Sequence, residues 1–411
     1  MRPSRSRRVT NTRILFLNRS FWPDLEATGQ FLTELCDDLS QDHEVTIVAG
    51  PSYHAGSAGR RPWSRETRGK VSIIRTWGTR FPKSILLGRL TNLGTYYLLA
   101  AIAAFRLERP DVIVAETDPP LLGALAALLK QRWGCRLVYN VQDLYPDIAE
   151  ATGGLRSPLL LELLRRANDF AYERADLIVT LGQDMARRII DKGVPADKVV
   201  VVPDWVDCRR IRPLESNQFR RSFGGKFVVM YSGNVGLSQQ LETVLEAAER
   251  LRGDDRILFA IIGEGARKKW LQERAREKGL DNVKFLPYQP KENLGESLSA
   301  ADLHLIPLAP GAAGCLVPSK IYGILAAGCP FIAMMEENAE VASIAREYAV
   351  GFVVRPGDVD ALTRTIRESV DAPERLAQMG TRARRLAEQR FDRIKVTSRF
   401  GSVLTSVAMQ N

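Results

Sequence analysis

The feature that most constrains the fold is an alternation of short apolar runs with helical segments, which occurs twice along the chain. Residues 13–18 begin the first series and residues 227–231 begin the second, and both runs have the character of buried parallel strands. The alternation predicts open, mostly parallel sheets with helices on both faces. Because 411 residues exceed what one core holds, we predict an α/β protein with two doubly wound, Rossmann-like domains. Further strands are expected at 44–49, 112–115, 137–141, 177–180, 257–262, 283–286, 303–306 and 331–333.

The turn-rich segment 203–213 separates the two series and predicts a linker. We therefore expect a basic, disordered head at 1–12, a first domain at 13–208 and a second domain at 209–390. Residues 391–411 are expected to form a helix that crosses back to the first domain. Two crossings close together predict a hinge that lets the domains close on a ligand.

Ligands of open α/β sheets bind beyond the carboxyl ends of the strands, so the loops that follow these strands should line one cleft. Three of these loops in the second domain are rich in glycine. The loop Gly233-Asn234-Val-Gly236 and the loop from Gly263 through Gly265 to Arg267 are each compatible with a simple turn. Neither is a complete dinucleotide-binding fingerprint, because no Gly-x-Gly-x-x-Gly with a following acid is present. With the third loop at 308–319, they favour a phosphate-bearing ligand.

The third loop continues into a pattern that predicts a short helix beside a ligand. Small residues at 311–314 allow the backbone to approach a ligand closely, and Pro318-Ser319-Lys320 suits a helix start. Gly328 and Pro330 should end that helix. Helix amino ends and a lysine both attract phosphate, so this stretch suits a diphosphate. An ordinary connection with a solvated lysine is the alternative.

Acidic residues follow a strand of the first domain. Asp143 and Asp147 come just after the expected strand at 137–141, where a carboxylate is well placed for chemistry. A helix cap is the alternative interpretation for both residues. Asp24 and Glu26, beside Gly29, carry the same ambiguity.

Composition excludes several other classes of protein. Five scattered cysteines without a Cys-x-x-Cys pair argue against a disulfide framework and against a thiolate zinc site. Only three histidines are present, His304 among them inside an apolar run, and no cluster predicts a protein-held metal. The net charge of +10 attracts anionic partners, but no nucleic-acid recognition motif accompanies it. The basic head lacks the apolar region of a signal peptide.

Residues 80–105 combine basic, aromatic and aliphatic side chains, and two interpretations fit them. One is a surface helix at a membrane interface, and the other is a core helix with charged ends. The longest uncharged apolar run, at 90–105, is shorter than the ~20 residues that span a bilayer. We therefore expect a cytoplasmic protein with peripheral contact to an anionic membrane.

The motifs, taken in order, match a known family over residues 13 to 393. The chain resembles bacterial glycosyltransferases of the GT-B fold in the large retaining family 4, and is most similar to the surface-polysaccharide branch of L-fucosamine and colanic-acid type. Each piece is loose, but the ordered set at these spacings is specific. It comprises Pro23 and Gly29, His43-Glu-Val-Thr-Ile-Val48, Asp118-Pro-Pro120, Gln142-Asp143-Leu-Tyr-Pro146, Val202-Pro-Asp-Trp-Val-Asp207, Tyr231-Ser-Gly-Asn-Val-Gly236, Ile262-Gly-Glu-Gly265, Phe285-Leu-Pro-Tyr288, Pro318-Ser-Lys320, Ala326-Ala-Gly-Cys-Pro330 and Arg355-Pro-Gly-Asp358.

The resemblance implies roles for individual residues. It implies that the second domain binds a nucleotide-sugar, that the first domain holds the acceptor, and that catalysis needs no metal. Asp143 would lie near the reacting sugar, Gly29 would close over the phosphates, and Tyr288 would lie near the base. Retention would proceed through a front-face path in which the leaving diphosphate assists the acceptor hydroxyl. The other implied donor contacts are Gly233, Asn234, Gly263, Gly265, Arg267, Val317, Pro318, Ser319 and Lys320.

The chain departs from the broader family at two pairs of positions. Where that family has two glutamates eight residues apart, this chain has Cys315 and Gly323. Where it has an Arg and a Lys after the first strand of the second domain, this chain has Asn234 and Gln239. Lys320 is a candidate to replace one cation, and loss of activity is the alternative.

We therefore expect a retaining glycosyltransferase in bacterial surface polysaccharide synthesis, such as O-antigen, capsule or exopolysaccharide. The expected donor is a UDP-sugar, with a GDP-sugar second, and the expected acceptor is an undecaprenyl-diphosphate-linked glycan at the inner face of the membrane. Two other functions are compatible with the same cleft. A non-catalytic nucleotide-sugar binding partner would explain the missing glutamates, and a GT-B nucleotide-sugar epimerase would need acid–base residues that the lack of cleft histidines disfavours.

Overall fold

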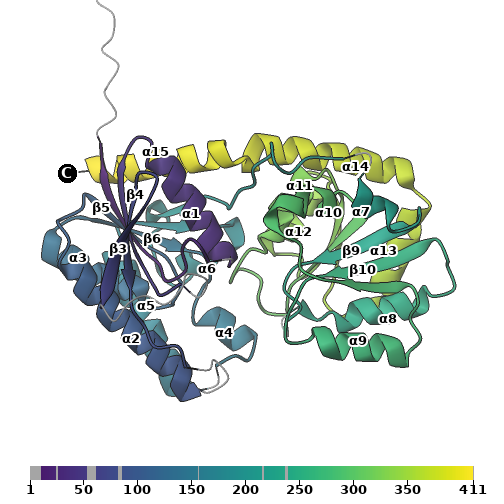
Figure 1. Cartoon of the computed structure of the whole chain (residues 1–411), viewed down its shortest axis with the longest axis horizontal. Helices are drawn as coiled ribbons and strands as arrows, with labels where there is room; N and C mark the ends of the chain where they lie inside the picture. The colour runs from purple at the N-terminus through teal and green to yellow at the C-terminus, as the bar shows by residue number, and fades with distance from the viewer. Residues whose placement is uncertain are drawn as a thin grey trace, which may run out of the picture.

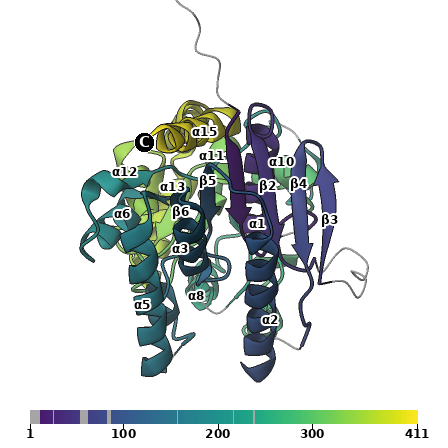
Figure 2. The same ribbon diagram turned by 90° about the vertical axis from the view of Figure 1, so that its left-hand side faces the viewer.

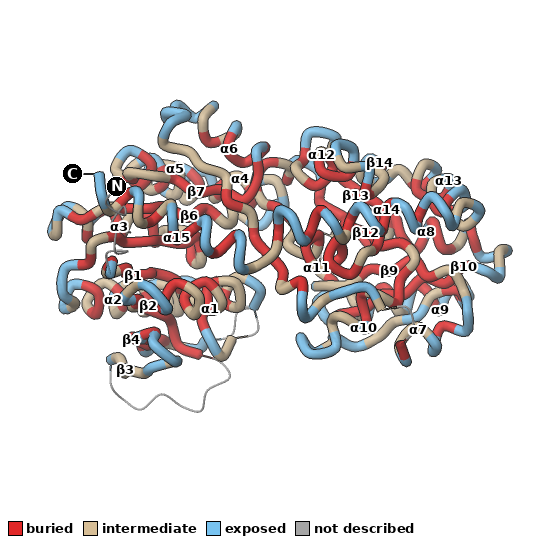
Figure 3. Tube along the Cα trace, turned by 90° about the horizontal axis from the view of Figure 1, so that it is seen from above, coloured by how far each residue is buried: buried red, intermediate tan, exposed pale blue. Residues whose placement is uncertain are grey.

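The computed structural model describes residues 11–24, 26–52, 62–81, 86–155, 157–214, 217–236 and 239–410. Two α/β lobes lie side by side, each built on its own sheet (Figure 1). Buried strands form the centre of each lobe, and helices cover both faces (Figure 3). The two doubly wound sheets predicted from the sequence are thus confirmed. The predicted basic head lies almost entirely outside the described residues.

The first sheet has eight strands in the order β3-β4-β2-β1-β5-β6-β7-β8, and only the β3–β4 pair is antiparallel. The chain order reverses between β1 and β5, which is where open sheets place their ligands. The strands are β1 (Arg13–Leu17), β2 (Glu44–Ala49), β3 (Trp63–Arg68), β4 (Val71–Thr76), β5 (Val112–Ala115), β6 (Arg136–Val141), β7 (Leu177–Thr180) and β8 (Val199–Val201). The helices are α1 (Ala27–Leu39), α2 (Leu86–Phe105), α3 (Leu122–Trp133), α4 (Asp147–Ala151), α5 (Pro158–Arg174) and α6 (Gln183–Ile190).

The second sheet is parallel, with the order β11-β10-β9-β12-β13-β14 and its reversal between β9 and β12. Its strands read as unbroken apolar runs because helices cover both faces; β10, for example, is buried along its whole length. The strands are β9 (Phe227–Ser232), β10 (Ile257–Ile262), β11 (Val283–Leu286), β12 (Leu303–Pro307), β13 (Phe331–Met334) and β14 (Gly351–Val354). The helices are α7 (Gln218–Arg221), α8 (Glu242–Arg250), α9 (Lys268–Glu277), α10 (Leu294–Leu298), α11 (Lys320–Ala326), α12 (Glu340–Glu347), α13 (Val359–Val370) and α14 (Pro373–Leu386).

The last helix, α15 (Arg393–Met409), returns to the first lobe and packs beside α1 (Figure 1). Its buried face, which includes Phe400 and Leu404, belongs to the core of that lobe. The Arg393 guanidinium donates to both carboxylate oxygens of Asp38, at 2.9 and 2.7 Å. At the crossing, the backbone of Val206 bonds to Phe391 and Arg393, so the two connections between the lobes lie together.

The structure confirms His304 as the core residue expected from the sequence. His304 is fully buried, its Nε2 lies 2.9 Å from the carbonyl oxygen of Leu298, and burial lowers its pKa to about 4. It is a core residue, as predicted. No helix within the described ranges is long and apolar enough to cross a bilayer.

Candidate functional site

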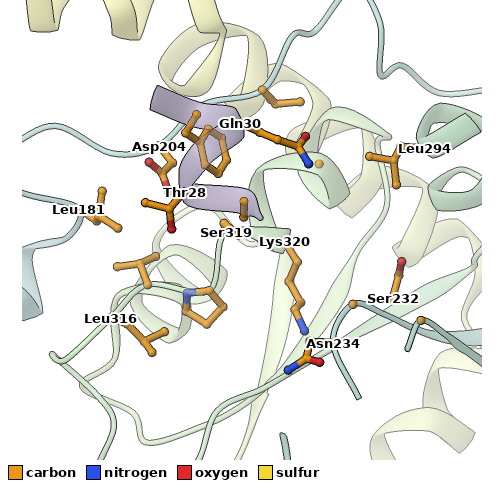
Figure 4. A pocket seen from close by; sticks show the side chains of 18 of the residues that line it. Thr28, Gln30, Leu181, Asp204, Ser232, Asn234, Leu294, Leu316, Ser319 and Lys320 are labelled. Atoms are coloured by element: carbon orange, nitrogen blue, oxygen red, sulfur yellow. The ribbon is translucent and has the colours of Figure 1, made fainter. Parts of the chain in front are cut away.

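A cleft of about 680 Å³ lies between the lobes, at the carboxyl ends of strands from both sheets (Figure 4). The first lobe contributes the first turns of α1, residues 142–143 and the segment 204–207. The second lobe contributes the loops that follow β9, β10 and β11, and the segment from β12 to the start of α11. The cleft thus occupies the position that the alternation of strands predicts.

Lys320, the first residue of α11, extends into this cleft (Figure 4). Its ammonium lies 3.1 Å from the Tyr231 hydroxyl oxygen and 4.2 Å from the centre of that ring. The Tyr231 hydroxyl in turn donates to the carbonyl oxygen of Asn234, at 2.5 Å. Within the described chain no carboxylate lies within ion-pair distance of Lys320, and burial lowers its pKa to about 7. An ammonium that is shielded from water and lacks a carboxylate partner favours an anionic ligand.

The glycines of the two neighbouring loops let their backbones touch. A Cβ on Gly263 would lie 1.9 Å from the carbonyl oxygen of Gly233, and Gly263 has a φ of +141°. A Cβ on Gly265 would lie 2.3 Å from the carbonyl oxygen of Val235. The backbone amide of Gly233 donates to the carbonyl oxygen of Ile262 at 3.0 Å, and that of Val235 donates to the carbonyl oxygen of Glu264 at 2.8 Å. These two hydrogen bonds hold the loops together. The second loop therefore supports the first, which lies against Lys320.

The loop between β12 and α11 binds the first lobe directly. The amide of Leu144 donates to the carbonyl oxygen of Cys315 at 2.7 Å, and Asp143 pairs with Leu316 as an isolated antiparallel bridge. The amide of Gly314 donates to Asp184 of α6 at 3.1 Å. This loop therefore joins the lobes on one side of the cleft.

Two carboxyl groups of the first lobe face the same cleft, the half-buried Asp143 and the buried Asp204. Burial raises the pKa of Asp143 to about 6, and the nearby Asp118 adds to the shift. Burial raises the pKa of Asp204 to about 7, and Asp143 adds to that shift. Asp147 has a different role, because its carboxylate pairs with Arg188 and Lys192 at 3.1 and 2.8 Å. Of the four acids weighed from the sequence, Asp24, Glu26, Asp143 and Asp147, only Asp143 is among the residues that line the cleft.

Most of the residues predicted for the site line the cleft together with Asp143: Gly233, Asn234, Gly263, Tyr288, Val317, Pro318, Ser319 and Lys320. Tyr288 is half-exposed at the rim.

Three predicted residues do not line the cleft. Gly29 is buried on α1 against the backbone of Ser20 and Phe21, while Thr28 and Gln30 on either side of it do line the cleft. Gly265 packs on the neighbouring loop, as described above.

The third is Arg267, whose guanidinium lies 3.9 Å from the Trp270 ring and pairs with Glu242. Its amide donates to the carbonyl oxygen of Val235 at 3.0 Å. Arg267 therefore supports the glycine loop from behind.

The two positions that depart from the family differ in their surroundings. Cys315 is fully buried and does not line the cleft, although Ala312 and Leu316 near it do. Gly323 lines the cleft, but a Cβ there would lie 3.0 Å from the Leu298 side chain. Sequence reasoning missed Asp204, although the motif at 202–207 contained it, and also missed Gln30, Phe31 and Glu34 of α1. Among the described residues, no group of three His, Cys, Asp or Glu side chains could hold a metal ion.

Solved structures with the same arrangement of lobes define the class. The Anabaena protein HepE, solved in complex with UDP, superposes with a TM-score of 0.73 at 18% identity, covering 96% of this chain and 100% of that chain. Sucrose-phosphate synthase from Thermosynechococcus elongatus gives a TM-score of 0.77 at 16% identity, covering 96% and 98%. These likenesses establish the GT-B fold.

Sequence comparison then gives the family. Residues 27–205 match the model of the glycosyl transferase 4-like domain, and residues 215–386 match that of glycosyl transferases group 1. The Pseudomonas aeruginosa glycosyltransferase WbjE is 30% identical over 321 residues, 76% of this chain and 80% of WbjE. An Escherichia coli K12 protein named for colanic acid biosynthesis, WcaI, is 28% identical over 405 residues, 94% and 98% of the two chains. The chain belongs to this family of GT-B glycosyltransferases and is a transferase.

Proposed function

We propose that this glycosyltransferase transfers a sugar from a UDP-sugar to a lipid-linked glycan, with retention of configuration, in the synthesis of a bacterial surface polysaccharide. The observation that carries the proposal is Lys320, an ammonium without a carboxylate partner in the described chain, beside two glycine loops at the carboxyl end of β9. HepE has been solved in complex with UDP and with UDP-glucose, and WcaI is named for colanic acid biosynthesis. Both facts support the assignment of the donor and of the process.

The proposed chemistry is electrostatic. When the bond between the sugar and the diphosphate breaks, negative charge develops on the diphosphate, and a cation placed beforehand stabilises that charge most strongly away from water. Lys320 supplies this cation from the second lobe, where it lies beside Gly233. The leaving diphosphate then assists the acceptor hydroxyl on the same face of the sugar. We propose that no metal ion takes part.

The first test is thermal unfolding with UDP, GDP, ADP and their sugars, with and without EDTA. A ligand that binds only the folded protein stabilises it by ~2.7 kcal/mol at a hundredfold excess over its dissociation constant. We expect UDP and its sugars to raise the melting temperature equally with and without EDTA. A rise in melting temperature with GDP alone would mean that the donor is a GDP-sugar. Loss of the rise in EDTA would refute the metal-free site. No rise with any nucleotide would refute the donor assignment.

Transfer itself is tested with a synthetic polyprenyl-diphosphate-linked sugar as acceptor, with the anomeric configuration of the product read by NMR. An inverted linkage would contradict retention. Nucleotide-sugar binding with no transfer or hydrolysis would favour the non-catalytic partner, and interconversion of free nucleotide-sugars would favour the epimerase.

We further propose that the first lobe contacts an anionic membrane to reach this acceptor. Helices α2 and α5 both extend to the end of the lobe that lies away from α15 (Figure 2). Large apolar residues are exposed at that end: Leu87 is 73% exposed, Leu159 82% and Leu163 58%. An apolar end with a basic chain behind it suits an anionic interface.

Co-sedimentation with phosphatidylglycerol vesicles tests the contact, with phosphatidylcholine vesicles as the comparison. We expect Leu159→Ser with Leu163→Ser to reduce binding at least fivefold. Ile394→Ser, which removes an exposed apolar side chain from α15, is the matched control and should bind as the wild type does. Equal binding by all three proteins would refute the assignment of this surface.

A further inference from the structure

Asp204 lies on the first-lobe wall of the cleft, in the segment that follows β8 (Figure 4). Thr28 of α1 and Leu181, which follows β7, line the cleft with it and are drawn on the same side in Figure 4. The residue is only 3% exposed, although it lines the cleft. An acid this deeply buried normally has a hydrogen-bond or ion-pair partner, because burying an unpaired charge is costly.

The structure gives this carboxyl group no such partner. Among the described residues, no hydrogen bond or ion pair reaches the side chain of Asp204, and the same holds for Asp143. The neighbouring acids differ: Asp118 accepts from Arg19 and Ser20, at 3.1 and 2.6 Å, and Asp207 accepts the amide of Arg209 at 3.0 Å. Asp204, which is buried, and Asp143, which is half-buried, therefore line the cleft without a side-chain partner in the described chain.

A third acid lies close to them. Glu116 lies behind Asp204 at the end of β5, is 2% exposed, and accepts one hydrogen bond from Asn140 at 2.9 Å. Burial first, and then Asp204 and Asp118, raise the pKa of Glu116 to about 8. Lys320, which has no ion-pair partner in the described chain, belongs to the opposite lobe. The cleft therefore has a cationic wall toward the proposed diphosphate and an acidic wall toward what the diphosphate carries.

We propose that Asp204, together with Asp143 on the same wall of the cleft, contacts the transferred sugar and selects against sugars that carry a carboxylate. This inference rests on the proposed donor and names its sugar class: a neutral or amino sugar rather than a uronic acid. A carboxyl group without a partner in the protein is free to bond to sugar hydroxyls: it accepts from them when ionised, and it can also donate when protonated. A further carboxylate would face like charge in a site with little water.

The pair UDP-glucose and UDP-glucuronic acid isolates this effect, because the two donors differ only at C6, as CH₂OH or carboxylate. Dissociation constants for both, and for UDP alone, are measured by calorimetry near neutral pH. We expect the wild type to bind UDP-glucuronic acid at least tenfold more weakly than UDP-glucose. Asp204→Asn, which keeps the volume, should narrow that ratio at least fivefold while the affinity for UDP changes little.

Asp207→Asn is the matched control. Asp207 lines the same cleft, but its carboxylate already caps the backbone of Arg209, so the wild-type ratio should persist. Equal affinity of the wild type for both donors, or an unchanged ratio in Asp204→Asn, would overturn the inference while leaving UDP binding intact. Failure to bind UDP itself would refute the proposed donor and this inference with it.

Discussion

The sharpest consequence of the cleft is a proton taken up by Lys320 when the donor binds. In the free protein its pKa is about 7, because burial disfavours the charged form. A diphosphate beside the ammonium favours the charged form and moves the pKa back toward its ordinary value of 10.5. The bound protein then holds more protons than the free protein, so affinity is highest at low pH and falls as pH rises above about 7.

The magnitude follows from the free-state value. If the bound pKa lies well above the range studied, affinity for a UDP-sugar falls ~15-fold between about pH 7 and about pH 8.5. Near pH 7 roughly half a proton is taken up for each ligand bound, and near pH 8.5 almost one. A UDP-sugar is the right probe because its diphosphate does not titrate there, whereas the terminal phosphate of UDP does.

Calorimetry in buffers of different ionisation enthalpy measures the uptake directly. Asp143 and Asp204 also titrate near this range, so the informative quantity is the difference between the wild type and Lys320→Arg, whose charge is permanent. We expect the arginine variant to lose the steep dependence on pH, and Lys320→Met to bind weakly at every pH. Equal pH profiles for the wild type and the arginine variant would refute the assignment of Lys320 to the diphosphate.

Three further predictions concern turnover and stability. Asp143→Asn should lower kcat at least tenfold more than it weakens donor binding, as measured by steady-state kinetics and calorimetry, because the carboxyl group faces the cleft from the lobe opposite Lys320. Gly263→Ala should lower the free energy of unfolding by about 2–4 kcal/mol, since its Cβ would lie 1.9 Å from a carbonyl oxygen, whereas Gly253→Ala, with nothing within 4 Å, should cost little in denaturant titrations. Arg393→Met should cost ~1–3 kcal/mol by breaking the paired hydrogen bonds to Asp38, and Arg399→Met on the exposed face of α15 is its control.

Sequence reasoning found most of the strands that read as apolar runs. The predicted ranges of β2, β5, β7 and β10 agree with the structure because helices on both sides require an unbroken apolar run, and the range of the edge strand β11 also agrees. β4 was missed although it is almost wholly buried between β2 and β3. The antiparallel pair β3–β4 escaped prediction because β3 is an edge strand of mainly polar residues, Ser64-Arg-Glu-Thr-Arg68 (Figure 3). β8 and β14 are short edge strands next to turns, so their apolar runs are no longer than those of many loops.

The site was predictable where backbone geometry demands particular residues. Glycine loops and a proline before a helix leave a pattern, and this pattern located Gly233, Gly263 and Lys320. Asp204 leaves no such pattern, because an acid in a turn-rich linker is typical of an exposed residue. Only the packing of Trp205 and α1 around it, which depends on contacts distant in sequence, makes it a buried residue of the cleft. Gly29 is the opposite case, because the sequence predicted it at the ligand but it does not line the cleft. Its small size instead lets α1 pack against Ser20 and Phe21.

The distribution of unsatisfied charge indicates where the stability of this fold originates. Lys320 on one wall and Asp143 and Asp204 on the other are partly or fully removed from water without ionic partners in the described chain, and each destabilises the free protein. The compensating contacts lie on the far side of the first lobe, where α15 adds apolar side chains to the core and Arg393 binds Asp38. Because α15 also carries one of the two connections between the lobes, the same helix stabilises the first lobe and anchors the hinge. Neutralising the cleft should therefore stabilise the free protein and impair its function: Lys320→Met is expected to raise the free energy of unfolding near pH 7 by about 1–2 kcal/mol while donor binding is lost. Denaturant titration of the ligand-free variant checks this expectation, and an unchanged or lowered free energy of unfolding would mean that Lys320 is already stabilised by the protein and is not held ready for an anionic ligand.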